Sequence, residues 1–190
     1  MQMQNHLSAK EEAALIKMFK DKATKQEAFV TCINCFQQKT YWHIRRIVIG
    51  HEDADDVLQN TFIKVWENVS NFRAESKLST WIYTIATNEA LQFLKKQKKN
   101  SFVSIEHIHD SLSQNLKTDP YFNGNHLQLI LQEAILTLPE KQRLVFNMKY
   151  FDEMKYEEIA SILGTSVGGL KASYHHAVNK VEKHVKKKIS

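Results

Sequence analysis

The side chains best suited to chemistry lie together in residues 77–99, which read KLSTWIYTIATNEALQFLKKQKK. On a helical wheel of about 100° per residue, this stretch separates into an apolar and a polar face. The polar face consists of Thr84, Thr87, Asn88, Leu91, Lys95 and Lys98, with Trp81 and Tyr83 on the flanks. Unpaired bases stack on aromatic rings, hydroxyls and amides bond base edges, and lysines neutralise phosphates. The stretch therefore indicates a surface for single-stranded nucleic acid; the alternative is an ordinary solvated face with Trp81 in the core.

A second stretch, residues 156–178, fits the helix-turn-helix template with the sequence YEEIASILGTSVGGLKASYHHAV. Ala160 is small where two helices would cross, and Gly164 stands in the tight turn, where a positive φ is expected. Thr165 or Ser166 can cap the second helix, whose N-terminal end would enter the major groove of DNA. The alternative is a helical hairpin that binds no DNA.

Other constellations indicate neither a metal site nor catalysis. Cys32 and Cys35 lack the two further ligands that zinc needs, and they lie within an apolar helical stretch rather than in the βαβ context of a redox pair. His107 and His109 lie in a polar stretch and are expected to be solvated. No nucleophile elbow, phosphate-binding glycine loop or HExxH motif occurs, so we expect no enzyme, no cofactor and no metal.

The elements that carry these residues are expected to be helices throughout. Among 190 residues there are only 5 Gly and 2 Pro, and no segment alternates apolar and polar residues as a strand does. The formal charge of +5 favours a polyanionic partner. No apolar run approaches the roughly 20 residues of a membrane span, and the N-terminus does not resemble a signal peptide. A soluble, cytoplasmic protein is expected.

Capping signals and apolar periodicity predict where these helices begin and end. Ser8 and Thr24 each precede a glutamate by three residues, which is the pattern of a capping box. Ser76 or Ser79 can cap the fourth helix, and Pro139 is expected at the first position of another. The apolar face of the fourth helix is expected to consist of Leu78, Ile82, Ile85, Ala86, Ala90 and Phe93. The expected helices span about 9–20, 25–49, 54–69, 78–99, 127–137, 139–151, 156–163 and 167–187.

Helical periodicity fails between the two halves, which predicts an all-α protein of two small domains joined by a flexible linker. The first domain would span 1–99, the linker 100–125 and the helix-turn-helix domain 126–190. The first domain has 15 Lys and Arg against 11 Asp and Glu, and the second has 10 against 7. The linker is mildly acidic. Two basic domains are consistent with a partner that is a polyanion.

Residues 53–99 and 134–180 resemble regions 2 and 4 of the sigma-70 family of RNA polymerase initiation factors, specifically the extracytoplasmic-function (ECF) group. The resemblance covers about residues 10–99 and 127–185, and the order and separation of both motifs match the group. It implies a protein that binds core RNA polymerase and directs promoter-specific initiation by recognising the −35 element and melting the −10 element. The linker would thread toward the catalytic cleft of the polymerase.

The resemblance assigns a docking surface to the third helix, which in the family contacts the clamp helices of the largest polymerase subunit. The matching positions are Asp55, Asp56, Gln59, Asn60, Ile63 and Trp66. An exposed isoleucine among polar residues suggests a partner surface, whereas Trp66 could instead belong to the core.

By the same resemblance, the loop and the fourth helix recognise and melt the −10 element, with the loop capturing a base flipped out of the non-template strand. The matching positions are Phe72, Arg73, Lys77, Ser79, Thr80, Trp81, Thr84, Asn88, Lys95 and Lys98. Two positions depart from the family pattern, which commonly has a basic residue in place of Thr84 and an aspartate in place of Gln92. Because Thr84 replaces the usual basic residue, the −10 sequence that this protein recognises is harder to predict.

The helix-turn-helix implies duplex contacts at the −35 element, and in the family this domain also binds the flap of the polymerase. The matching positions are Thr165, Ser166, Gly168, Gly169, Lys171, Ala172, Ser173, His175, His176 and Lys180. In the family, basic side chains usually stand at the places of Ser173 and His176. We therefore expect either weaker −35 affinity than in a typical member, or readout that depends on DNA shape and on Lys171 and Lys180. The family also implies an anti-sigma factor as a partner, and no small-molecule substrate.

Two other classes of protein remain open from the residues alone. One is a stand-alone helix-turn-helix regulator with a ligand- or partner-sensing N-terminal domain, which would bind duplex DNA without polymerase. The other is a helical interaction or enzyme domain whose basic faces are incidental.

Overall fold

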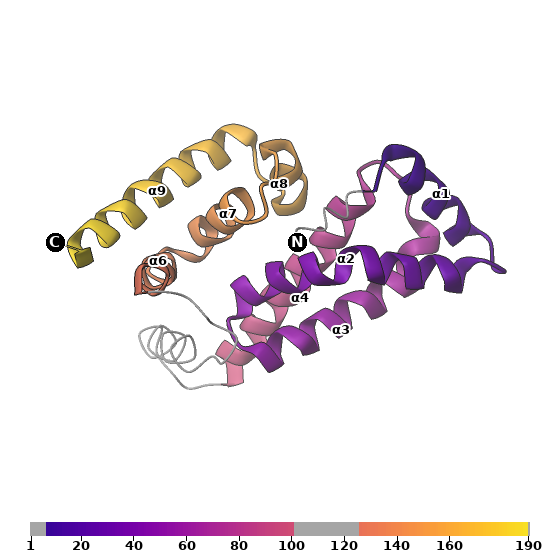
Figure 1. Cartoon of the computed structure of the whole chain (residues 1–190), viewed down its shortest axis with the longest axis horizontal. Helices are drawn as coiled ribbons and strands as arrows, with labels where there is room; N and C mark the ends of the chain where they lie inside the picture. Colours follow the sequence, from indigo (N-terminus) through magenta and orange to yellow (C-terminus); the bar gives the residue numbers. More distant parts are fainter. Residues whose placement is uncertain (1–6, 101–125, 190) are drawn as a thin grey trace.

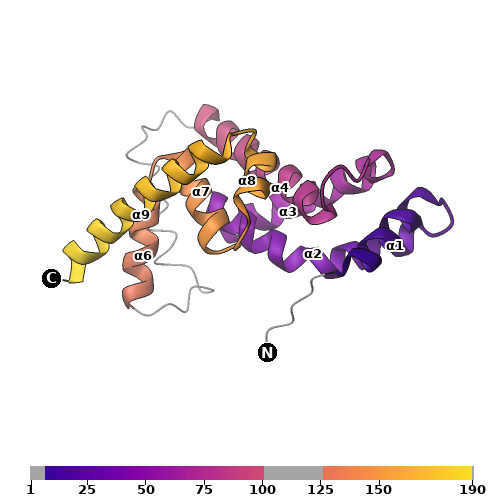
Figure 2. The ribbon, with the colours of Figure 1, turned by 90° about the horizontal axis from the view of Figure 1, so that it is seen from above.

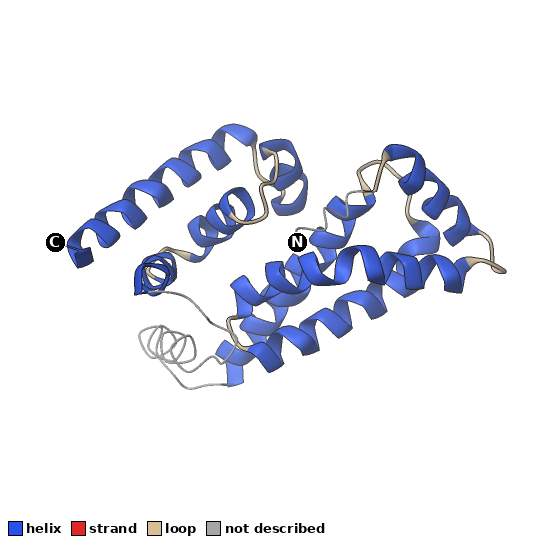
Figure 3. Cartoon of the chain, viewed as in Figure 1, coloured by secondary structure: helices blue, strands red, loops and turns tan. Residues whose placement is uncertain are grey.

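The computed structural model describes residues 7–100 and 126–189, and every regular element in these ranges is a helix (Figure 3). This confirms the expected all-α class, while the expected linker lies almost wholly outside the described residues. None of the described helices has both the length and the apolar character needed to cross a membrane. The elements are α1 (Ala9–Lys20), α2 (Lys25–Val48), α3 (His51–Asn68), the short 3-10 helix η1 (Val69–Asn71), α4 (Leu78–Asn100), α6 (His126–Leu136), α7 (Glu140–Tyr150), α8 (Tyr156–Leu163) and α9 (Val167–Ile189).

The capping predictions are confirmed in part. Ser8 forms the expected capping box, because its hydroxyl accepts the amide of Glu11 at 3.3 Å and its own amide donates to the Glu11 carboxylate at 2.7 Å. The box at Thr24 is wrong, since that hydroxyl donates to the carbonyl oxygen of Met18 at 2.9 Å and caps nothing. Pro139 occupies the N-cap position itself. The third helix begins at His51, earlier than expected, because the chain leaves α2 at Ile49, which has φ 71, and Gly50 is already the N-cap.

The N-terminus of α4 is capped from a distant helix rather than by a nearby serine. The amide of Leu78 donates to the Glu12 carboxylate of α1 at 2.7 Å. The hydroxyl of Ser76 lies 3.3 Å from the carbonyl oxygen of Lys77, and Ser79 is inside the helix. The predicted serine cap is therefore wrong. Helix α1 thus fixes the point where the expected base-capturing loop ends and α4 begins.

Replacing Glu12 by alanine should lower the free energy of unfolding by about 1 kcal/mol, because the amide of Leu78 would lose its capping acceptor. Urea denaturation followed by circular dichroism measures the change. Glu12→Gln is the matched control, since it keeps an acceptor oxygen at the same reach and should lose only part of that stability. Equal stability of the alanine variant and the wild type would contradict the capping role.

The core of the first half forms where α1, α2, α3 and α4 meet. Leu15, Phe36, Val65 and Ile82 are among its buried side chains. Cys32 packs in the same cluster as a free thiol, as expected for a packing residue. Burial is the main cause that raises the pKa of the Cys32 thiol to about 12, and the neighbouring Cys35 adds to it. Such a thiol remains protonated near neutral pH and is a poor nucleophile.

The second half contains the expected helix-turn-helix, formed by α8, the turn at Gly164 and α9. Gly164 has φ 61, the left-handed conformation that the turn was expected to require. Ile159, Leu170 and Ala177 are buried between these helices and α7. Helix α6 packs against α9 and closes the other side of the core.

The two halves contact each other, and the contact is made chiefly by α8 against α4 and by α7 against α2. Both views show α8 beside α4, with α6 and the C-terminal end of α9 farther away (Figures 1 and 2). The side chain of Tyr83, on α4, lies within an apolar cluster otherwise supplied by the second half. The helix-turn-helix is therefore held over part of the surface that was expected to contact unpaired bases.

Candidate nucleic-acid and polymerase interfaces

One side of α3 exposes all six residues that were expected to dock on the polymerase. Ile63 is 50% exposed and Trp66 is 37% exposed, while Val57 and Val65 on the opposite side are buried. This helix therefore has one face in the core of the first half and another open to a partner. Exposed apolar side chains flanked by acidic and amide groups are typical of an interaction surface. The six are Asp55, Asp56, Gln59, Asn60, Ile63 and Trp66.

Trp66 lies at the edge of this surface rather than in the core. Its ring packs against Phe29 at a centroid distance of 5.0 Å, and the ammonium of Lys25 lies 4.3 Å from the ring centre. A cation over an indole ring is stabilised by the ring's electrons. Helix α2 therefore orients the Trp66 side chain while part of it remains accessible, and the alternative of a core tryptophan is wrong.

The loop between η1 and α4 exposes charged side chains, and the aromatic ring of its first residue packs beneath them. Ala74 has φ 58, a left-handed conformation that is unusual for a residue with a Cβ and that turns the chain sharply. Arg73 and Glu75 on either side are largely exposed, with 3.9 Å between their charged groups. Phe72 is buried and its ring lies 5.0 Å from that of Trp81, tilted by 35°. Phe72 thus packs against Trp81 and is largely inaccessible to solvent, so it is not available as the −10 contact that was expected.

The polar face predicted for α4 is exposed only in part. Asn88 and Lys95 are exposed, Ser79 and Thr84 are half-buried, and the side chain of Lys98 lies outside the described part of the chain. The hydroxyl of Thr84 donates to the backbone carbonyl of Thr80 at 2.9 Å.

Two side chains that the wheel placed on or beside the polar face, Tyr83 and Thr87, are buried, and so is Thr80, which the family resemblance assigned to the −10 strand. The wheel assigned a single core face to α4, but this helix is covered on one side by α2 and α3 and on another by α8. Burial of Tyr83 raises the pKa of its phenol, and the nearby Asp152 carboxylate raises it further. The expectation of a solvent-facing side chain is therefore wrong at Thr80, Tyr83 and Thr87.

An ion pair joins the expected base-capturing loop to the helix-turn-helix. The ammonium of Lys77 lies 2.9 Å from the Glu158 carboxylate of α8. Burial acts to raise the pKa of Glu158, but hydrogen bonds from Lys77 and from the Lys155 amide, with the charges of both lysines, outweigh it and the pKa is lowered. Glu158 is therefore a carboxylate at neutral pH, and Lys77 is engaged by a protein group where contact with the −10 strand was expected.

The leading end of α9 is open to solvent, as a recognition helix requires. The Ser166 hydroxyl accepts the Gly169 amide at 3.2 Å, so of the two expected capping residues Ser166 caps the helix. A Cβ at Gly168 would meet nothing within 4 Å, whereas one at Gly169 would lie 3.2 Å from the Ser166 hydroxyl. The expected duplex-contacting residues are all exposed except Ser173, which is half-buried: Thr165, Ser166, Gly168, Gly169, Lys171, Ala172, His175, His176 and Lys180.

A shallow basic groove of about 440 Å³ lies between α7 and α9, and it contains residues that sequence reasoning missed. His176 and Lys180 were expected, but Gln142 of α7 and Lys183 also line it. The ammonium of Lys180 donates to the side-chain oxygen of Gln142 at 3.1 Å. Only the packing of α7 against α9 brings Gln142 to this face, so no signal within either helix identifies it.

No metal centre is formed by the part of the chain that the structure describes, since no three His, Cys, Asp or Glu side chains converge there. Cys32 and Cys35 remain free thiols. His107 and His109 lie outside the described residues.

Comparison with known proteins matches both halves to one protein family. Sigma-70 region 2 matches residues 32–100, and Sigma-70, region 4 matches residues 128–181. RNA polymerase sigma factor SigV of Bacillus subtilis is 31% identical over 159 residues, which cover 84% of this chain and 92% of SigV. ECF RNA polymerase sigma factor SigW of the same organism is 28% identical over 169 residues, which cover 85% of this chain and 90% of SigW.

Two solved structures share the fold. One is sigma factor RpoE in complex with the anti-sigma factor NepR from Bartonella quintana, with a TM-score of 0.67, 22% identity, and coverage of 87% of this chain and 98% of that one. The other is CnrH in complex with the cytosolic domain of CnrY, with a TM-score of 0.68, 18% identity, and coverage of 93% of this chain and 97% of that one.

Proposed function

This chain belongs to the ECF group of the sigma-70 family of RNA polymerase sigma factors, and from that premise we propose how its surfaces divide the work of initiation. The exposed face of α3 docks on the polymerase clamp. The loop 72–77 and α4 capture and hold the melted −10 strand. The N-terminal end of α9 reads the −35 duplex. The observation that carries the proposal is the presence of both family regions, in family order, each with an exposed face of the required chemistry.

The protein therefore acts as an initiation factor in the cytoplasm and leaves the chemistry of RNA synthesis to the polymerase. Residues 1–99 form the unit that docks and melts, and residues 126–190 form the −35 unit, which also contacts the polymerase flap. Residues 100–125 connect them. An anti-sigma factor is the expected regulatory partner, in keeping with the RpoE complex that shares this fold.

We expect −35 binding to depend on few phosphate contacts, because two positions on α9 that are usually basic hold Ser173 and His176. Lys171 and Lys180 remain as basic side chains on this helix's exposed side. The groove formed with Gln142 and Lys183 adds further hydrogen-bond and charge contacts that the leading end of α9 lacks. Affinity for duplex DNA should accordingly be modest when the protein is apart from the polymerase.

Replacing His176 by arginine should strengthen binding to −35 duplex DNA and steepen its salt dependence by about one unit of log–log slope, because one more phosphate would be neutralised. Fluorescence anisotropy at several salt concentrations measures both quantities. His126→Arg is the matched control, since His126 is exposed at the start of α6, away from α8 (Figure 1). An unchanged slope for the His176 variant would remove that residue from the phosphate-contacting surface.

The proposed function is tested by in vitro transcription with core polymerase on the promoter upstream of this protein's own operon, a promoter that such factors often recognise. The expected result is a discrete run-off transcript that appears only when the protein is added. Tight, specific binding of duplex DNA without polymerase, together with no transcript and no binding to core enzyme, would instead favour a stand-alone regulator.

A further inference from the structure

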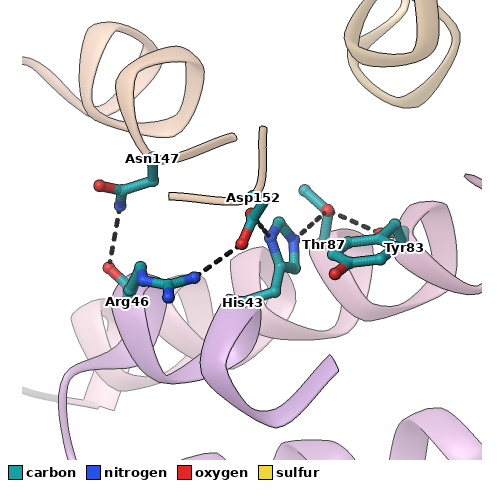
Figure 4. A network of polar contacts seen from close by, with 6 residues as sticks. All are labelled: His43, Arg46, Tyr83, Thr87, Asn147 and Asp152. Carbon is teal, nitrogen blue, oxygen red and sulfur yellow. Dashed lines mark hydrogen bonds and ion pairs between the residues drawn. The ribbon is translucent and has the colours of Figure 1, made fainter. Parts of the chain in front are cut away.

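A buried carboxylate joins the two halves of the molecule. Asp152 follows α7, and only 4% of its side chain is exposed. One carboxylate oxygen lies 2.7 Å from Nδ1 of His43, and the other lies 2.6 Å from Nη1 of Arg46 (Figure 4). Both partners belong to α2, more than 100 residues earlier in the chain. The second half therefore inserts a negative group between two basic side chains of the first half.

The contacts of His43 extend this junction onto α4. Nε2 of the imidazole lies 2.9 Å from the hydroxyl of Thr87, which also lies 2.7 Å from the carbonyl oxygen of Tyr83 (Figure 4). The amide of Asn147 on α7 donates to the carbonyl oxygen of Arg46 at 3.3 Å. His43 is itself only 1% exposed. One polar network thus connects α2, α4 and the end of α7.

Apolar contacts beside the network hold α8 over α4. The Tyr83 ring lies 4.7 Å from the imidazole of His43 and is packed among Met148, Met154 and Ile159 of the second half. The guanidinium of Arg46 lies 4.7 Å from the ring centre of Phe151. At the other end of this interface, Lys77 pairs with Glu158. The contact therefore covers the N-terminal part of α4 and engages the loop that precedes it.

We propose that Asp152 closes an intramolecular latch, in which the helix-turn-helix shields part of the −10-binding surface until the polymerase separates the halves. The inference rests on the proposed function, because the covered part of this surface includes Lys77 and Thr80, which are assigned there to the melted strand. A ligand that binds only the open form has its apparent affinity reduced by the fraction of molecules that are open. The latch would thus keep the free factor from binding single-stranded nucleic acid that is not presented by a polymerase.

The contact between the halves depends on buried polar and charged groups, which allows it to open. Burying a carboxylate costs desolvation energy, which His43 and Arg46 offset only while their geometry is kept. Water can solvate these groups when the halves part, and an interface of this polar kind resembles the separable contacts between domains. Replacing Asp152 by asparagine removes the negative charge and leaves one acceptor oxygen where His43 and Arg46 each contact a separate oxygen, so it should favour the open form.

The test compares full-length wild-type protein with Asp152→Asn and with Glu153→Gln, a charge-matched control at the exposed neighbouring carboxylate. Small-angle X-ray scattering reports separation of the halves without any DNA. Anisotropy reports binding of a fluorescent single-stranded oligonucleotide with the non-template −10 sequence of the protein's own promoter. Asp152→Asn should enlarge the radius of gyration and raise oligonucleotide affinity by about tenfold or more. Glu153→Gln should change neither.

A second variant guards against simple misfolding. Glu158→Gln keeps the capping-box geometry at the start of α8 but removes the charge that pairs with Lys77. It should move both readouts in the same direction as Asp152→Asn, by a smaller factor. Circular dichroism should show unchanged helix content in each variant. If both readouts for Asp152→Asn equal those of the wild type, or if its helix content falls, the latch is rejected.

Transcription with core polymerase separates failure of the latch from failure of the proposed function. With excess polymerase, wild type and Asp152→Asn should reach the same maximal transcript level, because docking itself opens the molecule. If transcription succeeds while scattering and oligonucleotide binding do not respond to the mutation, only the latch is overturned. If no protein supports transcription, the proposed function is overturned.

Discussion

A Trp81→Ala variant should form open promoter complexes about tenfold less well than the wild type, while its binding to core polymerase should be unchanged. The Trp81 ring lies on that of Phe72, with centroids 5.0 Å apart, and the residue is only half-buried. Stacking of one base on an aromatic ring contributes about 1–3 kcal/mol, which corresponds to roughly 5- to 150-fold in affinity. Permanganate reactivity of unpaired thymines in the −10 region measures the effect.

The matched control for this position is Trp81→Phe. It keeps an aromatic ring packed on Phe72. If the ring holds the strand by stacking, this variant should recover most of the melting activity. Thermal unfolding of both variants separates a loss of stacking from a loss of stability. Equal losses of core binding and melting in the alanine variant would reject Trp81 as a strand-holding residue.

An Asp56→Lys variant should bind core polymerase about tenfold less tightly or worse, without change in the stability of the free protein. Asp56 is exposed on the face of α3 that also carries Ile63 and Trp66. Reversing a charge opposite a complementary surface slows association and places like charges together. Titration of labelled core enzyme with the variant measures the affinity.

The control is the same charge reversal on another helix, Glu27→Lys. Glu27 is exposed on α2 two residues after Lys25, which lies over the Trp66 ring, so its side chain points away from that surface. The control should bind core polymerase like the wild type. If both variants weaken binding equally, net charge rather than the α3 face controls association, and the docking assignment fails.

Local patterns were sufficient wherever the deciding interaction lies within a few residues along the chain. The capping box at Ser8 and the left-handed turn at Gly164 are examples, because each requires only neighbouring groups. Apolar periodicity placed the helices closely for the same reason, since the core face of a helix repeats every three to four residues. The exposed face of α3 followed from the family resemblance, and the same periodicity supported it in part.

Local patterns failed where a partner comes from elsewhere in the fold. Thr24 has the residue spacing of a capping box, yet its hydroxyl binds the carbonyl of Met18 instead. The cap of α4 comes from Glu12, and nothing near Leu78 in the sequence indicates it. The burial of Thr87 reflects its contact with His43, a residue of another helix. Each case depends on a tertiary neighbour that a helical wheel does not contain.

By itself the sequence determined the all-α class, most helix boundaries, the helix-turn-helix and the resemblance to the sigma-70 family, because these depend on short-range spacing and on long motifs. Only the tertiary structure decided which polar groups of α4 are accessible and that Asp152 meets His43 and Arg46 across the two halves. The physical reason is that burial of a side chain depends on everything packed around it. A sequence pattern records only the preferences of one segment.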